Sequence, residues 1–200
     1  MLELTTDAPV SELERRILTQ LVRHRHSAWA LRDLLSDVPE EEAYLQLAEC
    51  LDLLLHRDAI FAMDIRGGGE RRYFPARLEI ESAADCDAPH LIVGLTTHGG
   101  ELWEADAQPD WSRLITVTPD YETFDKRWHV CAADAQTIDH HLKTSGLDDS
   151  HFLGDPKHDT VDSWQVTYWK TLPAAHRRRF MLTCRGKEYI RDLRNTYEIL

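Results

Sequence analysis

Apolar residues recur at spacings of three and four in three stretches near the start of the chain, and this period predicts helices. The first helix is expected over residues 11–25, where Ser11 and Glu14 form a capping box. A shorter helix is expected over residues 27–37 and a third over residues 39–60. Three glutamates in the first turn of the third helix suit the helix dipole.

The period changes after the third helix. Residues 60–76 alternate between two sets of side chains, are interrupted by three glycines at residues 67–69, and resume with Tyr73 and Phe74. This pattern predicts a β-hairpin with a glycine tip. Three helices followed by such a hairpin resemble the winged-helix superfamily over residues 11–76. The resemblance implies a module with a hairpin wing that serves either DNA binding or protein docking.

Charge favours protein docking over DNA binding in this module. The helix that would enter a DNA groove opens with three glutamates at residues 40–42, which would face phosphates. DNA affinity depends on several well-placed cations, so these carboxylates oppose it. If the module does bind DNA, the expected contacts are the wing arginines Arg66, Arg71 and Arg72.

A strand followed by a helix is expected in the middle of the chain. Residues 90–95 form a short apolar run, and Thr96 or Thr97 can cap the helix that follows. Gly99 and Gly100 lack the lysine and spacing of a phosphate-binding loop, so we expect them to allow close approach of backbone or an aromatic ring. The Leu-Thr-x-x-Gly pattern resembles a step found late in many winged-helix regulators. The C-terminal part also resembles an uncharacterised bacterial family, which implies no activity.

The rest of the chain alternates between strand and helix patterns. The expected elements are strands over 113–118 and 127–133, a helix over 134–146, a polar loop over 147–162, a hairpin of 163–170 with 178–185, and a helix over 187–200. We therefore predict an α+β protein of two domains. These are a winged-helix module of three helices plus a hairpin wing over residues 1–77 and a small acidic α+β domain with an antiparallel sheet over residues 78–200.

The net charge of −12 is unevenly distributed. Residues 79–162 carry 18 acidic and 5 basic side chains, whereas residues 163–200 carry 8 basic and 3 acidic ones. A strongly acidic middle repels phosphate backbones and suits a basic protein partner. We expect the arginines at residues 177–179 to pair within the molecule against this acidic segment.

The cysteines and the apolar runs restrict the setting of the protein. No two cysteines form a Cys-x-x-Cys pair, so buried free thiols are expected; the four are Cys50, Cys86, Cys131 and Cys184. No apolar run approaches the roughly 20 residues of a bilayer span, and the N-terminus lacks a secretory signal. These features predict a cytoplasmic protein without a membrane partner.

Candidate chemistry is sparse. His140 and His141 are adjacent, and His129 and Cys131 share a strand face, but none of these pairs has the i, i+4 spacing of a zinc helix. The histidines and aspartates of loop 148–159 leave a metal site open. No nucleophile motif is present. We therefore expect no catalytic residue, no cofactor and no metal.

These observations predict a non-catalytic cytosolic protein that binds another protein of basic charge. Small acidic proteins without catalytic motifs resemble bacterial immunity or antitoxin proteins, which cover the active surface of a basic effector. The residues expected to contact the partner are Glu101, Glu104, Asp106, Asp110, Trp111, Trp128 and Trp169. The alternative is a DNA-binding transcription regulator with a C-terminal sensing or dimerisation domain. Homodimerisation is compatible with either hypothesis.

Overall fold

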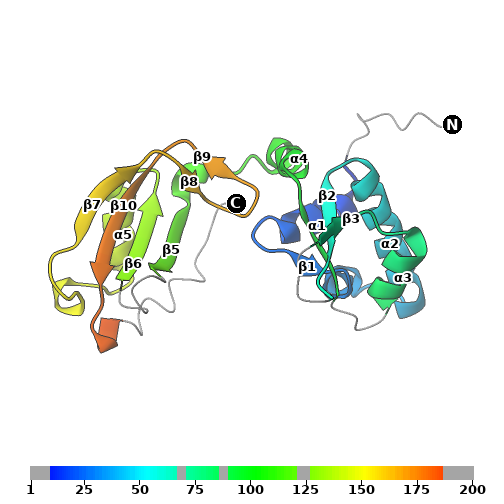
Figure 1. Cartoon of the computed structure of the whole chain (residues 1–200), viewed down its shortest axis with the longest axis horizontal. Helices are drawn as coiled ribbons and strands as arrows, with labels where there is room; N and C mark the ends of the chain where they lie inside the picture. Colours follow the sequence, from blue (N-terminus) through cyan, green and yellow to red (C-terminus); the bar gives the residue numbers. More distant parts are fainter. Residues whose placement is uncertain (1–9, 67–70, 86–89, 121–126, 187–200) are drawn as a thin grey trace. The chain divides into compact units, whose positions relative to one another are not determined.

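The fold is described from a computed structural model of the chain. It describes residues 10–66, 71–85, 90–120 and 127–186. The glycines of the expected hairpin tip, Cys86 and the expected final helix lie outside these ranges. The chain divides into two compact units (Figure 1). Unit 1 comprises Met1–Ala107 and Thr167–Lys170, and unit 2 comprises Gln108–Val166 and Thr171–Leu200.

The predicted α+β class with antiparallel sheets is confirmed. The division between the units differs from the predicted boundary after residue 77, which falls within helix α3 (Arg77–Asp85). The reason is packing, because α3 contacts α2 (Glu40–His56) and strand β4 (Leu91–Leu95) pairs with β2 (Ile60–Asp64). Residues just after the hairpin therefore complete the core of unit 1.

Unit 1 joins helices to a four-stranded antiparallel sheet of order β1-β4-β2-β3 (Figure 1). Its further elements are α1 (Glu12–Leu21), β1 (His26–Ser27), η1 (Trp29–Leu35), β3 (Arg71–Tyr73) and α4 (Thr97–Ala107). The two expected long helices, the hairpin and the strand after residue 90 are confirmed as α1, α2, β2–β3 and β4. The expected second helix is instead the 3-10 helix η1. Helix α3 was not predicted.

The N-terminal end of α1 is held by a buried carboxylate. Ser11 and Glu14 form the expected capping box, with the Ser11 amide donating to Glu14 at 2.6 Å. The other oxygen of Glu14 accepts a hydrogen bond from Arg57 at 2.9 Å, and the Glu14 side chain is only 5% exposed. One side chain thus caps α1 and ties it to the end of α2.

Unit 2 is a four-stranded antiparallel sheet of order β5-β6-β10-β7, with helix α5 against one face (Figure 1). Its elements are η2 (Trp111–Arg113), β5 (Ile115–Asp120), β6 (Arg127–Ala132), α5 (Ala135–Thr144), η4 (Asp149–His151), β7 (Lys157–Val161), β8 (Trp164–Gln165), β9 (Thr171–Leu172) and β10 (Ala175–Met181). The strands β5 and β6 and the helix α5, capped by Asp134, are confirmed. Val130, Phe180, Ile138 and Leu142 fill the space between sheet and helix.

The predicted hairpin of residues 163–170 with 178–185 is wrong. Strand β8 pairs with β9 in a separate two-stranded hairpin, while β10 pairs with β6 on one side and β7 on the other. Strand β7 lies within the expected polar loop and forms an edge of the sheet. It was not predicted because its Lys-His-Asp-Thr-Val sequence has no alternation of apolar and polar residues. Backbone pairing to β10 outweighs the weak local pattern there.

The expected internal pairing of the arginine cluster is confirmed. Arg178 contacts Asp139 of α5, and Arg177 and Arg179 both contact Asp159 of β7. The Asp159 carboxylate accepts two hydrogen bonds from Arg177, at 2.9 and 2.6 Å. These bonds hold the pKa of Asp159 below its usual value near 3.8.

We expect the stabilisation by Asp159 to be present at neutral pH and lost as the pH falls below about 4. A carboxyl with a depressed folded-state pKa stays charged in the folded protein while the unfolded chain takes up a proton. Asp159→Asn should lower the free energy of unfolding by about 2 kcal/mol at neutral pH and by progressively less in acid. Urea unfolding of both proteins across this pH range tests the prediction. A difference that stays constant with pH would contradict it.

None of the helices in the described ranges combines the length and the apolar content that crossing a bilayer requires.

Candidate functional site

The step from β4 to α4 has a structural role. Thr96 caps α4, because its hydroxyl accepts a hydrogen bond from the Gly99 amide at 3.0 Å. A Cβ on Gly99 would lie 1.7 Å from the carbonyl oxygen of Ala59, and one on Gly100 would lie 2.1 Å from the ring of Trp169. The prediction that these glycines admit a close backbone or ring is therefore confirmed at both positions.

The ring at Gly100 belongs to residues 167–170, which lie within unit 1. The Tyr168 hydroxyl donates to the Leu21 carbonyl at 2.7 Å and accepts from the Leu95 amide at 2.6 Å. Burial raises the pKa of Tyr168 to about 12, so the phenol keeps its proton. The indole of Trp169 donates to the Val22 carbonyl at 2.9 Å. These hydrogen bonds hold the rings of Tyr168 and Trp169 within unit 1.

The acidic residues expected to meet a partner are largely engaged within the chain. Glu104 forms an ion pair with Lys170 at 2.7 Å, and Asp106 forms one with Arg15 at 2.6 Å. Asp110 accepts a hydrogen bond from the Ser112 amide and caps η2. Of this acidic set, only Glu101 is exposed without a hydrogen bond or ion pair in the described part of the chain.

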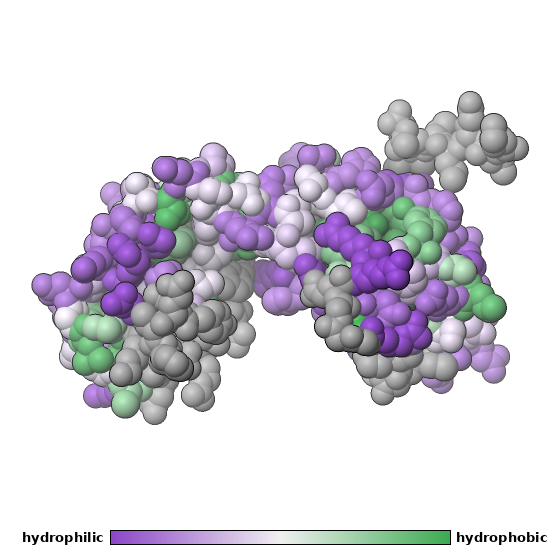
Figure 2. Space-filling model, in the orientation of Figure 1, coloured by the Kyte–Doolittle hydropathy of each residue, from purple (hydrophilic) through white to green (hydrophobic). Residues whose placement is uncertain are grey.

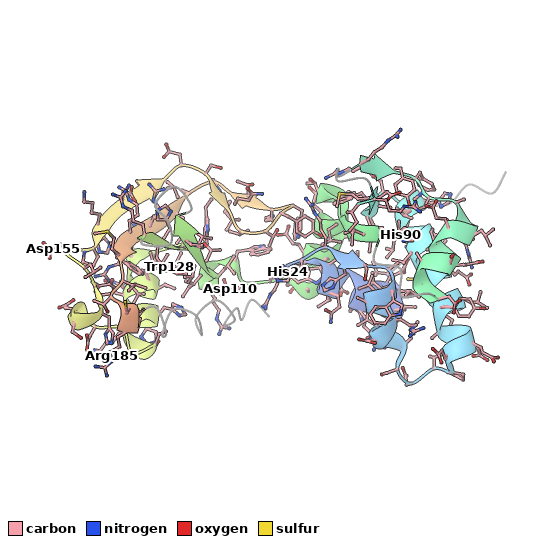
Figure 3. The ribbon with its side chains drawn as sticks, turned by 60° about the horizontal axis from the view of Figure 1, so that its bottom comes forward. His24, His90, Asp110, Trp128, Asp155 and Arg185 are labelled. Carbon is pink, nitrogen blue, oxygen red and sulfur yellow. The ribbon has the colours of Figure 1, made fainter. Side chains whose placement is uncertain are left out.

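The three tryptophans expected to anchor a partner lie in different environments. Trp128 is 6% exposed and belongs to the core of unit 2 (Figure 3). Trp111 is half-buried in η2, and Trp169 packs edge-on against Trp103 in unit 1. The rings of Trp128 and Trp169 are therefore engaged inside their own units.

Two of the three wing arginines are committed to contacts within unit 1. Arg66 makes bidentate hydrogen bonds to Asp64, the shortest at 2.6 Å. The guanidinium of Arg72 lies 3.9 Å from the centre of the Phe61 ring, in a cation–π contact. Arg71 is exposed. All three arginines are exposed, and among the described residues only the charge of Arg66 is compensated by a neighbouring carboxylate.

The solvent face of α2 combines carboxylates with exposed leucines. We call this the acidic–leucine face, and its residues are Glu41, Glu42, Leu45, Glu49 and Leu53. Leu45 is 42% exposed although seven other side chains of α2 are buried. The sequence from Glu40 to His56 contains no lysine or arginine. This face is both apolar and negatively charged.

Further apolar side chains extend the same side of unit 1. His56 follows Leu53 by three residues on α2, and its ring packs edge-on against Phe74 with centroids 4.9 Å apart. Phe74 is 57% exposed, and Leu78 on α3 is 76% exposed. Figure 2 shows apolar spheres among hydrophilic ones over the α2 and α3 region. Exposed large apolar side chains concentrated in this way are typical of interaction surfaces.

Sequence reasoning missed these apolar positions, although a signal was present. Leu45 and Leu53 fall outside the apolar stripe that predicts the buried side of α2, and they alternate with glutamates. Several apolar residues that fall outside the buried stripe of one helix indicate a candidate surface when further exposed apolar side chains lie near them. Phe74 was expected in the hairpin but follows the end of β3, and Leu78 could not be placed without knowing that α3 exists.

A second feature of unit 1 is an open hollow of about 570 Å³ at the start of α4. Side chains of both charge signs line it, including Arg72, Asp58 and Glu101.

No three histidine, cysteine or carboxylate residues in the described ranges converge as metal ligands. The Cys50 thiol is buried, which raises its pKa to about 12 and disfavours the reactive thiolate.

Comparison of the chain with protein-family models, curated proteins and solved structures finds no match.

Proposed function

We propose that this protein is a non-catalytic binding protein whose unit 1 docks a basic, amphipathic segment of another protein. The observation that carries the proposal is the acidic–leucine face, where exposed leucines and carboxylates share one side of a helix without a basic residue. A partner helix with leucines flanked by lysines or arginines complements this face in both apolar contact and charge.

The energetic division within such an interface is expected to be uneven. Burial of Leu45 and Leu53 supplies the apolar contribution, at roughly 25 cal/mol per Å² of surface removed from water. The exposed carboxylates contribute mainly to the association rate, because charge steers encounter more than it raises final affinity. Phe74 is the best placed aromatic anchor, since its ring is more than half exposed next to the end of α2.

We further propose that unit 1 is a winged-helix module used for protein docking. The order α1, η1, α2 and then the hairpin β2–β3 supports this assignment. The position of β3 at the edge of the sheet leaves the hairpin accessible. In this proposal α2 is the recognition helix, and its first turn presents Glu40, Glu41 and Glu42 to the partner. Inhibition of a basic effector, in the manner of an immunity or antitoxin protein, is the cellular role that this chemistry suits.

DNA-binding regulation is the alternative, and the exposed Arg71 on the wing is the observation in its favour. It requires a polyanion to approach the carboxylates of α2. Counterion release from three exposed wing arginines, one of them paired with Asp64, supplies limited affinity against these carboxylates.

Affinity for a model partner tests the proposal. The probe is a synthetic helical peptide with leucines at i, i+3 and i+4 spacing and lysines elsewhere, labelled for fluorescence anisotropy with the full chain. We expect Glu42→Lys combined with Glu49→Lys to weaken binding by tenfold or more, and Leu53→Ser to weaken it by about tenfold without a change in charge.

The matched control reverses the same number of charges elsewhere. Asp149→Lys with Asp162→Lys changes exposed carboxylates of unit 2 and should leave affinity within about twofold. Equal losses in both double variants would mean that the peptide senses net charge only. Tight binding of a duplex oligonucleotide that depends on Arg71 would favour the regulator hypothesis instead. Circular dichroism confirms that each variant is folded.

A further inference from the structure

The face of the unit 2 sheet that points away from α5 concentrates positive charge at one end. Strand pairing places Lys157 directly opposite Arg179 and Met181 directly opposite Arg127. Side chains two apart on one strand share a face, so the three cations lie together on β7, β10 and β6. We call Arg127, Lys157 and Arg179 the cationic end of the sheet. It is independent of the acidic–leucine face of unit 1.

Such a cluster is costly within an acidic protein. Like charges directly opposite each other on neighbouring strands destabilise a sheet. Arg179 shares the Asp159 carboxylate with Arg177, and Arg127 lies directly opposite Asp120 of β5. Lys157 has no ion pair with the side chains that the structure describes. The Nε of Arg179 is buried and has no hydrogen-bond acceptor among the described residues. The positive charge at this end is therefore only partly compensated.

The cluster surrounds a hollow with an apolar side. The hollow has a volume of about 190 Å³, and its lining is Arg127, Leu153, Asp155, Lys157, Arg179, Phe180 and Met181. Leu153 and Met181 are exposed large apolar side chains, and the Leu153 amide donates to the Met181 carbonyl at 2.8 Å. Asp155, labelled at the edge of unit 2 in Figure 3, is the one carboxylate in the lining. A ligand here would meet cations and an apolar surface together.

We propose that the cationic end of the sheet binds an acidic, amphipathic peptide segment of a protein partner. One or two carboxylates of the peptide lie between Arg127, Lys157 and Arg179, and arginine provides paired donors that match a carboxylate. An adjacent apolar side chain of the peptide lies in the hollow against Leu153 and Met181. The volume of about 190 Å³ accommodates one such side chain.

An acidic peptide fits this surface better than a nucleic acid does. Binding of single strands relies on stacking of bases on exposed aromatic rings. The ring beside the hollow, Phe180, is 4% exposed and packs into the core on the other side of the sheet. Three cations beside the carboxylates of Asp155 and Asp159 also give a short electrostatic track for a phosphate backbone.

Binding of a synthetic peptide with alternating glutamate and leucine tests the inference. With the full chain, we expect Arg127→Gln combined with Lys157→Gln to weaken binding of this peptide at least tenfold. Leu153→Ser should weaken it several-fold with the charges intact. Arg113→Gln with Lys143→Gln removes two exposed cations elsewhere in unit 2 and should change affinity by less than about twofold.

The outcomes separate the hypotheses. No binding of the peptide, or equal losses in the two double variants, would overturn the proposal. Tighter binding of a single-stranded oligonucleotide than of the peptide would also overturn it, in favour of a nucleic-acid surface. Because the lysine–leucine peptide that probes α2 should bind these variants normally, failure here is distinguishable from failure of the function proposed for unit 1.

Discussion

Replacing Gly99 with alanine is expected to lower the free energy of unfolding of unit 1 by about 3 kcal/mol or more. The new Cβ would lie 1.7 Å from the Ala59 carbonyl oxygen, which belongs to the backbone and cannot rotate away. That carbonyl also accepts a hydrogen bond from the Thr96 amide at 3.1 Å. Relief of the overlap must therefore move the start of α4 away from Ala59 and from β2, which begins at the next residue. Hydrogen–deuterium exchange of the amides in these elements measures the loss.

Two further variants on the same helix make the prediction specific. Gly100→Ala places its Cβ against the Trp169 ring, which is a side chain and can shift at the expense of its hydrogen bond to Val22, so we expect a smaller cost of about 1–2 kcal/mol. Ala105→Ser changes an exposed position of α4 and should alter stability by less than about 0.5 kcal/mol. A cost for Gly99→Ala no larger than that of Ala105→Ser would show that the close approach to Ala59 is absent in solution.

Glu14→Ala is expected to cost about 3 kcal/mol, the second largest effect. The substitution removes an acceptor for the Ser11 amide and leaves Arg57, whose side chain is 20% exposed, without its carboxylate. Breaking a buried pair by removing one partner leaves an uncompensated charge, which is the main source of the cost. Urea unfolding followed by tryptophan fluorescence measures it.

The neighbouring Glu12 supplies the matched comparison. It lies in the same first turn of α1, but its side chain is 71% exposed and pairs with Arg15 at the surface. Exposed pairs contribute at most about 1 kcal/mol, so Glu12→Ala should be nearly neutral. If Glu14→Ala and Glu12→Ala lower the free energy of unfolding equally, the loss comes from removing a negative charge near the start of the helix. The buried Glu14–Arg57 pair would then contribute little.

Local patterns predicted the elements whose signals lie within a few residues. The caps at Ser11 and Asp134 bond to backbone amides three residues away, so they are visible in the local sequence. Gly99 and Gly100 could be predicted because only a residue without a side chain allows such close approach. Strand partners depend on distant residues, so the pairing of β10 with β7 could not be read from either segment alone.

The position of residues 167–170 shows the same limit. Tyr168 and Trp169 look like part of a long strand because they follow an alternating run. Hydrogen bonds to Leu21, Val22 and Leu95, which are more than 70 residues away in the sequence, place them in unit 1 instead. No periodicity records such contacts. For the same reason the sequence could not tell that Trp169 is an internal anchor.

Charge was the part of the candidate site that the sequence predicted best. The three glutamates at the start of α2 are exposed, as the docking hypothesis requires. Individual contact residues were harder to predict. Glu104 and Asp106 form ion pairs with Lys170 and Arg15 of the same chain, and Trp128 lies in the core of unit 2. A carboxylate that already forms an ion pair within its own chain is less available to a partner.

The two proposed surfaces have opposite charge and lie in different units. The acidic–leucine face suits a basic segment, and the cationic end of the sheet suits an acidic one. A protein with both could hold two chemically distinct segments of one partner, or two partners.

Chemical shift changes in the ¹⁵N-labelled full chain, recorded while the lysine–leucine peptide is added, test the central claim most directly. We predict that the largest changes fall on the amides of the acidic–leucine face and around Phe74, and that they are abolished by Glu42→Lys with Glu49→Lys. Changes concentrated on the wing or in unit 2, with α2 unaffected, would contradict the account.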